Sequence, residues 1–358
     1  MPGMRSKIFY LLAAIGSLLS LQAQEYRWRL GFEYFFDNQE YEKSSYIDPQ
    51  TMNGIWLQPL AGISWDSAHA LLGGVNLLKI PGTDEVADKA ELVLYYQYET
   101  PKVLFRAGSF SSIEALPNYS DFFFSDSVNN FMPLMQGFFW QIGKERNFFN
   151  AWMDWTGYAT PEARENFFLG LSGKVSKGIF FGDFQSYLFH YAGTHPGNPA
   201  YGVSEHMQLM TSAGIEYESE NSFNGLFSVG LLAGLERDRK ADLSYSPVGF
   251  TARADASFWG FGTENTFYVG DARMRLYSQY GSELYWGNPF LRGSAYLQSK
   301  WYVGLIETER VSARLNCNLH FTEGNMLFQQ TLSVSASIDN FSRPERRTAR
   351  YPWMKIFQ

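Results

Sequence analysis

The chain has 358 residues, of which 45% are apolar, 18% are charged and 18% are aromatic, and its formal net charge is −7. The aromatic content excludes a disordered chain, and the acidic balance argues against a nucleic-acid partner, which would need a basic face. A single cysteine, Cys317, excludes an intramolecular disulfide framework and a zinc site built on cysteine pairs.

The N-terminus has the order of a secretory signal peptide. Arg5 and Lys7 precede an apolar run over 8–21, and Ala23 is the expected last residue removed. The run is too short for a membrane-spanning helix, which needs roughly 20 residues. We therefore predict a signal peptide over 1–23 and an exported mature chain.

Sixteen segments with alternating apolar and polar residues follow along the chain. The clearest runs from Val311 to Phe321, where apolar residues alternate with polar ones such as Arg314 and Asn318. Segments of roughly ten residues suit strands that cross a bilayer at a tilt, and aromatic residues at their ends suit an interfacial girdle. The predicted strands are 25–40, 52–66, 69–80, 90–99, 103–110, 135–144, 147–157, 166–175, 179–192, 206–217, 223–235, 248–259, 263–275, 294–307, 310–322 and 326–340.

The connections between these strands alternate in length. Short turns follow the even strands and long connections follow the odd ones, the longest near 110–134, 193–205, 236–247 and 276–293. Short periplasmic turns and long outer loops are typical of outer-membrane barrels. Backbone groups in hydrocarbon need internal partners, so the strands must close on themselves. The predicted fold class is all-β: one antiparallel transmembrane β-barrel of about 16 strands, with 14–18 tolerated, around a lumen that is normally aqueous.

The predicted barrel covers 24–341, and a basic tail over 342–358 follows it. The tail carries five basic residues and one acidic residue, a charge of +4. Pro352 and uneven alternation argue against a closing strand. We therefore expect a periplasmic C-terminal extension.

Two sets of charged residues are candidates for lining the lumen. The long loop over 109–135 carries Glu114, Asp121 and Asp126, which would constrict a pore and favour cations if the loop folds inward. The alternative is a solvated outer loop that packs on the rim. Charges on one face of strands twelve to fifteen would oppose this loop, or would simply pair with one another. These residues are Arg253, Asp255, Asp271, Arg273, Arg275, Lys300 and Arg314.

A third set combines aromatic rings with a carboxylate, which suits sugars because their flat C–H faces stack on rings. The alternative for these residues is an interfacial girdle and loop core. The candidates are Trp152, Asp154, Tyr187, Tyr285 and Trp286.

No hydrolytic site assembles within one strand. Ser186 and His190 share a face of the ninth strand but lie roughly 13 Å apart, too far for a nucleophile and its base. No GxSxG, SxxK or phosphate-binding glycine loop occurs. The five histidines show neither HxH nor HExxH spacing. A pair from neighbouring strands stays open, but because no constellation can be assembled we expect no enzyme, no metal and no cofactor.

With these features in place, the chain resembles Gram-negative outer-membrane β-barrels of the porin-like kind over roughly 24–341. Segments such as FRAGSFSS and FNAWMDWTG are similar in texture to barrel proteins of Bacteroidota-type bacteria. The resemblance implies a location in the cell outer membrane. It also implies contacts with outer-membrane lipid and lipopolysaccharide and with the barrel-assembly machinery, in a monomer or homotrimer.

The function that this resemblance implies is passive diffusion of small polar solutes or glycans. One alternative is a barrel plugged by its own loops, which binds glycans or acts as a scaffold at the cell surface. Another is a channel for polysaccharide export.

Overall fold

The computed structural model describes residues 24–144, 146–219, 223–308 and 310–340. The predicted signal peptide and basic tail lie outside these residues. No helix among the described residues is long and apolar enough to cross a membrane.

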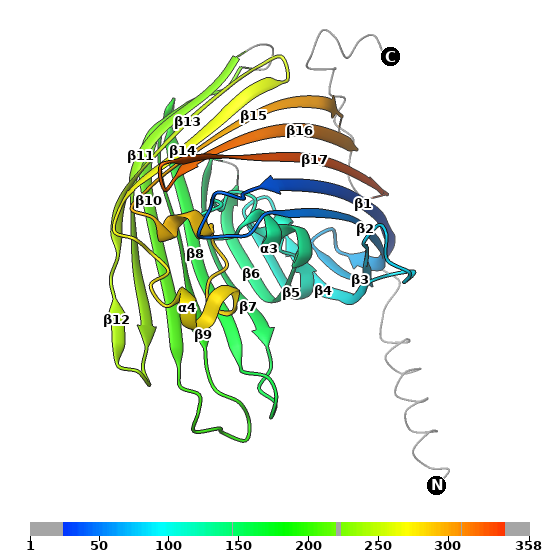
Figure 1. The fold of residues 1–358 in the computed structure, drawn as a ribbon. Helices are drawn as coiled ribbons and strands as arrows, with labels where there is room; N and C mark the ends of the chain where they lie inside the picture. The colour runs from blue at the N-terminus through cyan, green and yellow to red at the C-terminus, as the bar shows by residue number, and fades with distance from the viewer. Residues whose placement is uncertain (1–23, 145, 220–222, 309, 341–358) are drawn as a thin grey trace.

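The described strands form one closed antiparallel barrel (Figure 1). Consecutive strands pair along the chain, and β1 pairs with β17 to close the ring. All sixteen predicted strands are present in the described residues. They are β1 (Glu25–Glu40), β2 (Gln50–Trp65), β3 (His69–Lys79), β4 (Lys89–Glu99), β5 (Val103–Ser111), β6 (Leu134–Lys144), β7 (Asn147–Gly157), β8 (Asn166–Lys177), β9 (Phe180–Tyr191), β10 (Ser204–Tyr217), β11 (Phe223–Asp238), β13 (Val248–Phe258), β14 (Phe261–Gly270), β15 (Ala295–Glu307), β16 (Val311–Thr322) and β17 (Asn325–Asp339). A short extra strand, β12 (Leu243–Tyr245), pairs with the end of β11.

Side chains alternate between the lumen and the outer wall along each strand. In β1, Leu30 and Phe32 point outward and are 41% and 37% exposed, whereas Phe35 and Asp37 are buried inside. An outer belt of exposed apolar side chains fits hydrocarbon. Below, the end of the barrel with long connections is called extracellular and the end with short turns periplasmic, following the orientation predicted from the sequence.

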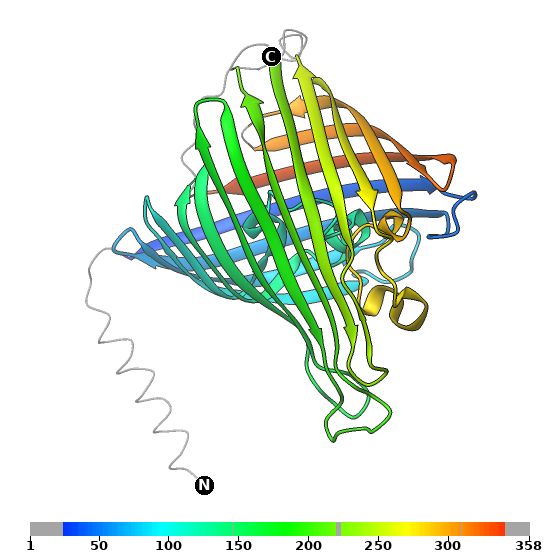
Figure 2. The same ribbon diagram turned by 90° about the vertical axis from the view of Figure 1, so that its left-hand side faces the viewer.

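Two long connections enter or cover the barrel. The inner loop (112–133) joins β5 to β6 and contains α2 (Ser112–Ala115) and α3 (Asp126–Phe131). It lies within the ring of strands in both views (Figures 1 and 2). The cap loop (271–294) joins β14 to β15 and contains α4 (Tyr277–Tyr280) and the 3-10 turns η1 (Gly281–Glu283) and η2 (Pro289–Arg292).

One buried cluster fills the extracellular half of the lumen. Phe122 and Phe123 of the inner loop are 1% and 0% exposed. The Phe123 ring contacts Tyr187 of β9 at 5.4 Å, and Phe124 contacts Phe168 of β8 at 5.8 Å between ring centroids. Each large apolar side chain buried in this way contributes about 1.5–3 kcal/mol. The cluster also contains Tyr41, Leu60, Leu72, Val93, Phe110, Phe139, Leu232, Tyr268, Phe290, Tyr296 and Leu327 from around the barrel. This half of the lumen is a packed core rather than an aqueous passage.

Candidate functional site

The acidic residues of the inner loop are all bound to the barrel wall. The Glu114 carboxylate forms ion pairs with Arg29 of β1 and with Arg106 of β5, the latter at 3.3 Å. Burial opposes ionisation of Glu114, but the two guanidinium groups outweigh burial and hold the pKa of the carboxyl below its ordinary value. The inner loop is therefore anchored to two separate strands.

Two further anchors lie along the same loop. Asp121 lies 3.6 Å from the Lys300 ammonium of β15. Burial raises the pKa of the Asp121 carboxyl, against the opposing pull of Lys300. Asp126 accepts a hydrogen bond from the Gln329 amide of β17 at 3.1 Å. The three predicted constriction residues thus lie inside the barrel, and their role as a charge filter stays a prediction.

The predicted wall charges on β13, β15 and β16 pair with carboxylates rather than forming an unpaired basic patch. Arg253 lies 2.6 Å from Asp255, and Arg314 lies 2.6 Å from Glu264. Together with Lys300 they stand near a cavity of about 450 Å³ on the periplasmic side of the inner loop. Arg253 and Arg314 therefore follow the alternative given above, in which the charges of the lumen wall pair with one another.

Three predicted lumen charges are not on the barrel wall. We predicted a strand over 263–275, but β14 ends at Gly270, so the predicted end of this strand was wrong. Asp271, Arg273 and Arg275 belong to the cap loop instead of the strand. The buried Glu236 carboxylate of β11 accepts hydrogen bonds from the backbone N–H groups of Met274 at 2.7 Å and Arg275 at 2.6 Å. These bonds hold the chain away from the sheet, because a backbone N–H bound to a side chain is not available to a neighbouring strand.

Four of the five predicted sugar-stacking residues are buried, and Trp286 is half-buried. Trp152 and Tyr187 are each 2% exposed and Tyr285 is 3% exposed. The Trp152 indole donates to the Tyr119 hydroxyl at 2.9 Å, and Trp286 packs against Phe168 with 4.8 Å between ring centroids. The Asp154 carboxylate accepts the backbone N–H of residue 136 at 2.7 Å. Stacking needs an open ring face, so the alternative of a loop core describes how Trp152, Tyr187 and Tyr285 pack in this structure, and the sugar-stacking role stays a prediction.

The outer wall carries a row of side chains at its extracellular rim. Trp155, Phe167, His190, Glu205 and Arg237 occupy paired register positions on five adjacent strands, β7 to β11. The Trp155 and Phe167 rings stack at 5.2 Å, and the Phe167 and His190 rings stack at 4.9 Å. Two stacked aromatic rings therefore lie next to a histidine, an acid and a cation along the same row. We call these five residues the rim row.

The centre of the rim row is a histidine–carboxylate pair. His190 Nδ1 lies 3.8 Å from Glu205 Oε1, and Arg239 Nε donates to Glu205 Oε2 at 3.1 Å. The His190 side chain is 22% exposed, so it remains accessible. Outward-facing Leu169 and Met207 lie on the membrane side of the row and are 41% and 39% exposed. The rim row thus lies at the boundary between the apolar belt and the charged extracellular rim.

Sequence reasoning missed this pair because its members come from different strands. The search for catalytic groups compared residues within one strand, where His190 meets only Ser186. The register of the β9–β10 hairpin pairs His190 with Glu205 across a twelve-residue connection over 192–203. Hairpin register would have revealed the pair, but alternation alone does not fix it across a long loop. No group of three or more metal-ligating side chains occurs among the described residues.

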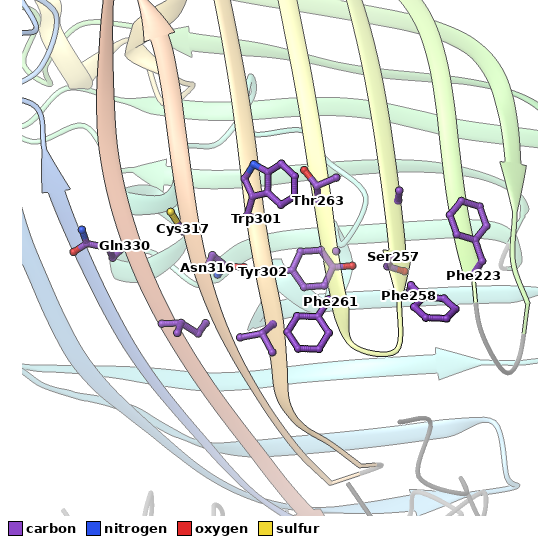
Figure 3. Close-up of a pocket in the computed structure, with 14 residues that line it drawn as sticks. Phe223, Ser257, Phe258, Phe261, Thr263, Trp301, Tyr302, Asn316, Cys317 and Gln330 are labelled. Carbon is purple, nitrogen blue, oxygen red and sulfur yellow. The ribbon is translucent and has the colours of Figure 1, made fainter. Parts of the chain in front are cut away.

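A groove of about 630 Å³ lies on the outer wall toward the periplasmic end (Figure 3). Phe258, Phe261, Trp301 and Cys317 are among the residues that line it. The lining residues include no histidine, acid or cation. The groove is therefore part of the apolar belt.

The fold is similar to solved outer-membrane proteins. OpdL of Pseudomonas aeruginosa matches with a TM-score of 0.55 at 10% identity, over 88% of this chain and 99% of OpdL. A loop L8 deletion mutant of OmpT, an outer membrane protein of Vibrio cholerae, matches with a TM-score of 0.52 at 10% identity, over 88% of this chain and 100% of that one. No curated protein matches the sequence. These matches confirm the porin-like resemblance at the level of the fold. The closed barrel with its apolar outer belt confirms the predicted outer-membrane location.

A family model described as lipid A 3'-O-deacylase-type matches residues 19–340. This match covers the whole barrel and overturns our expectation that the chain is not an enzyme, because the family is one of enzymes. The expectation was wrong because it considered catalytic pairs only within single strands. The chain belongs to the lipid A 3'-O-deacylase-type family.

Proposed function

We propose that this protein hydrolyses an acyl ester of a phosphorylated glycolipid in the outer leaflet, using the rim row as its active site. The observation that carries this proposal is the His190–Glu205 pair on the outer wall, with 3.8 Å between Nδ1 and Oε1. Family membership supports ester chemistry. The packed extracellular half of the lumen supports a site on the outer wall rather than inside the barrel.

His190 is the general base in this proposal. Its Nδ1 faces Glu205, so Nε2 is left to take a proton from water. The water oxygen bonds to the ester carbonyl carbon, and the bond from that carbon to the sugar oxygen then breaks. His190 returns the proton to the leaving sugar oxygen, giving a fatty acid and a free hydroxyl. Glu205 stabilises the imidazolium, and its contact is expected to shorten when substrate binds.

The surroundings of the pair suit an amphiphilic substrate. Arg237 is exposed beside Glu205 and supplies positive charge toward a phosphate. Leu169 and Met207 offer an apolar wall for acyl chains. Trp155 and Phe167 lie at the level where aromatic rings favour the membrane interface.

The test is the release of fatty acid from purified lipid A by the detergent-solubilised protein, followed by mass spectrometry of the lipid product. We expect H190N to reduce the rate at least about 100-fold, as for loss of a general base. E205Q should reduce it less, because the base remains. The matched control is H69N, since His69 is also on the outer wall and lies 3.7 Å from an acid, Asp66, but at the periplasmic end. Absence of release, or equal losses in H190N and H69N, would contradict the proposal.

A diffusion channel is the second candidate. Cavities of about 450 Å³ and 420 Å³ flank the inner loop on the periplasmic side, and movement of that loop would connect them with the outside. Planar-bilayer recordings of the refolded protein test this candidate. Stable conductance steps of porin size would support passive diffusion of small polar solutes, and a cation preference would implicate Glu114, Asp121 and Asp126. Absence of conductance steps from protein that is shown to be folded would count against the diffusion channel.

A further inference from the structure

We infer that the larger lumen cavity below the inner loop binds a neutral, hydroxyl-rich solute of disaccharide size, which enters from the periplasm. The cavity has a volume of about 450 Å³, and strands from β7 to β15 contribute to its wall. Pockets for small molecules usually measure roughly 300–1,000 Å³. This inference is independent of the proposed hydrolysis and of conductance, because the rim row lies outside the barrel and a bound solute need not pass the inner loop.

The cavity is closed on its extracellular side by the inner loop. The Gln185 side chain of β9 accepts the backbone N–H of Ser120 at 2.9 Å and donates to the backbone carbonyl of Asn118 at 2.6 Å. At the other end, the lining reaches Glu218, which is exposed and directly follows β10 at the periplasmic end. A solute therefore enters this cavity from the periplasmic side.

A row of polar side chains crosses the wall of the cavity. Successive register partners on four neighbouring strands form it: Ser228 of β11, Arg253 of β13, Thr266 of β14 and Gln298 of β15. Within the described part of the chain, no hydrogen bond involves the side chains of Ser228, Thr266 or Gln298. Ser228 and Gln298 are nevertheless only 6% and 5% exposed. Because burying polar groups without partners is costly, the row favours an occupant that forms hydrogen bonds.

The charges around this row favour a neutral occupant over an ion. Lys174 lies 2.5 Å from Glu216, and Lys300 lies 3.6 Å from Asp121. Arg253 is paired as described above, so all three cations of the lining have a carboxylate partner. An added anion would meet carboxylates and find no free cation, whereas an added cation would meet three basic groups. An ion of either sign is therefore repelled by part of the wall.

The remaining groups of the cavity suit the hydroxyls and the C–H surface of a sugar. The Asp183 carboxylate accepts a hydrogen bond from the Ser212 hydroxyl and keeps further lone pairs for other donors. The Gln298 amide can both donate and accept, as a sugar hydroxyl does. Phe148 of β7 also lines the cavity, and no ring contact covers it among the described residues. Its ring is therefore free to contact sugar C–H groups.

The first experiment locates the bound sugar by cysteine protection in detergent-solubilised protein. The native Cys317 is replaced by alanine, and T266C then reports on this cavity. Cellobiose, maltose or lactose at twice its dissociation constant or above should slow the reaction of T266C with a small methanethiosulfonate reagent at least about threefold. The control is S335C in the cavity of about 420 Å³, which should keep its rate. Absence of protection by all three sugars would show that the cavity holds only water and would overturn the inference.

Charged disaccharides test the preference for a neutral solute. Chitobiose carries ammonium groups and cellobionate carries a carboxylate, and both are close in size to cellobiose. Each should protect T266C less than cellobiose does, because part of the lining has the same charge as the ligand. Protection by chitobiose or cellobionate that exceeds that of every neutral sugar would overturn the inference, by assigning the cavity to an ion.

The second experiment measures the affinity of the neutral sugar that protects best, by isothermal titration calorimetry. T266V removes one hydroxyl at nearly constant shape and should weaken binding about fivefold, and Q298L should weaken it about tenfold. The matched control is T322V, the same change at a buried threonine of β16 outside this cavity, which should bind as the wild type does. Heat-modifiable gel mobility shows that each variant is folded. Equal affinities in T266V, Q298L and T322V would overturn the inference.

Discussion

The Tyr285 hydroxyl of the cap loop donates to the fully buried Glu236 carboxylate of β11 at 2.9 Å. Glu236 also accepts two backbone N–H groups of the cap loop, from Met274 and Arg275. A single acid in the wall thus holds both the start and the middle of this loop, and buried carboxylates bound in this way are strong anchors.

Replacing this anchor should release the cap loop while leaving the barrel closed. In E236Q an amide N–H₂ faces N–H donors, so at least one buried donor loses its acceptor, at a cost of about 1–3 kcal/mol. Y285F removes one hydrogen bond and should cost about 1 kcal/mol. Limited proteolysis of the cap loop measures both effects, with faster cleavage expected in E236Q than in Y285F. If E236Q were cleaved at the wild-type rate, Glu236 would not be what holds the cap loop in place.

Arg237 should determine the preference for phosphorylated lipid at the rim row. R237Q is expected to weaken the use of a phosphorylated glycolipid roughly five- to tenfold, because a charge-assisted contact is lost. Hydrolysis of the dephosphorylated lipid should be unaffected. Comparison of kcat/KM for the two lipids gives the result, and an equal loss on both would show that Arg237 acts on the fold rather than on the phosphate.

Acidification should loosen the inner loop through Glu114. The folded-state pKa of Glu114 lies below its ordinary value of 4.5. Its ionised form therefore stabilises the fold above that pH, and the stabilisation is lost as pH falls through the folded-state pKa. Thermal unfolding between about pH 7 and about pH 3 should show this loss in the wild type, whereas E114Q should lack this component and be less stable by about 1 kcal/mol near neutrality. If the stability of the two proteins depended on pH in the same way, Glu114 would not be the group that loosens the inner loop.

Gly170 provides a test of the packed lumen. A Cβ at this position would overlap the Trp152 ring. G170A must therefore displace that ring, and we expect a loss of about 1–3 kcal/mol from overpacking. The matched control is G182A on the neighbouring strand, where the nearest atom is 3.8 Å away. Thermal unfolding with tryptophan fluorescence should detect a large change only in G170A, and equal effects would argue against close packing over Gly170.

The strands could be predicted because their signal is local. Leu30 points outward and Glu33 inward under the same two-residue alternation that runs through the other strands. The early end of β14 depends instead on Glu236, which lies 38 residues before Met274 in the chain. The inward path of the inner loop likewise depends on Arg29 and Arg106, which alternation does not connect with Glu114.

The candidate site was hidden for a related reason. Each member of the rim row is an ordinary residue within its own strand, and only the register across β7 to β11 places them side by side. Periodicity along one strand contains no information on register when the connecting loops are long. The acidic residues of the inner loop could be named from the sequence as candidates, but their partners on the wall could be identified only in the closed barrel.

The hydrogen bonds of Gln329 bear on how the protein is assembled in the cell. Its amide donates to Asp37 of β1 at 2.8 Å and to Asp126 of the inner loop at 3.1 Å, while β1 and β17 form the seam of the barrel. The same residue therefore joins the first strand, the last strand and the inserted loop. Closure of the seam and placement of α3 are therefore coupled, because the two partners of one amide lie on the first strand and on the inserted loop. A barrel in which β1 and β17 have not met would consequently lack the Gln329–Asp37 bond, and the placement of α3 would then depend on the remaining contacts of the inner loop.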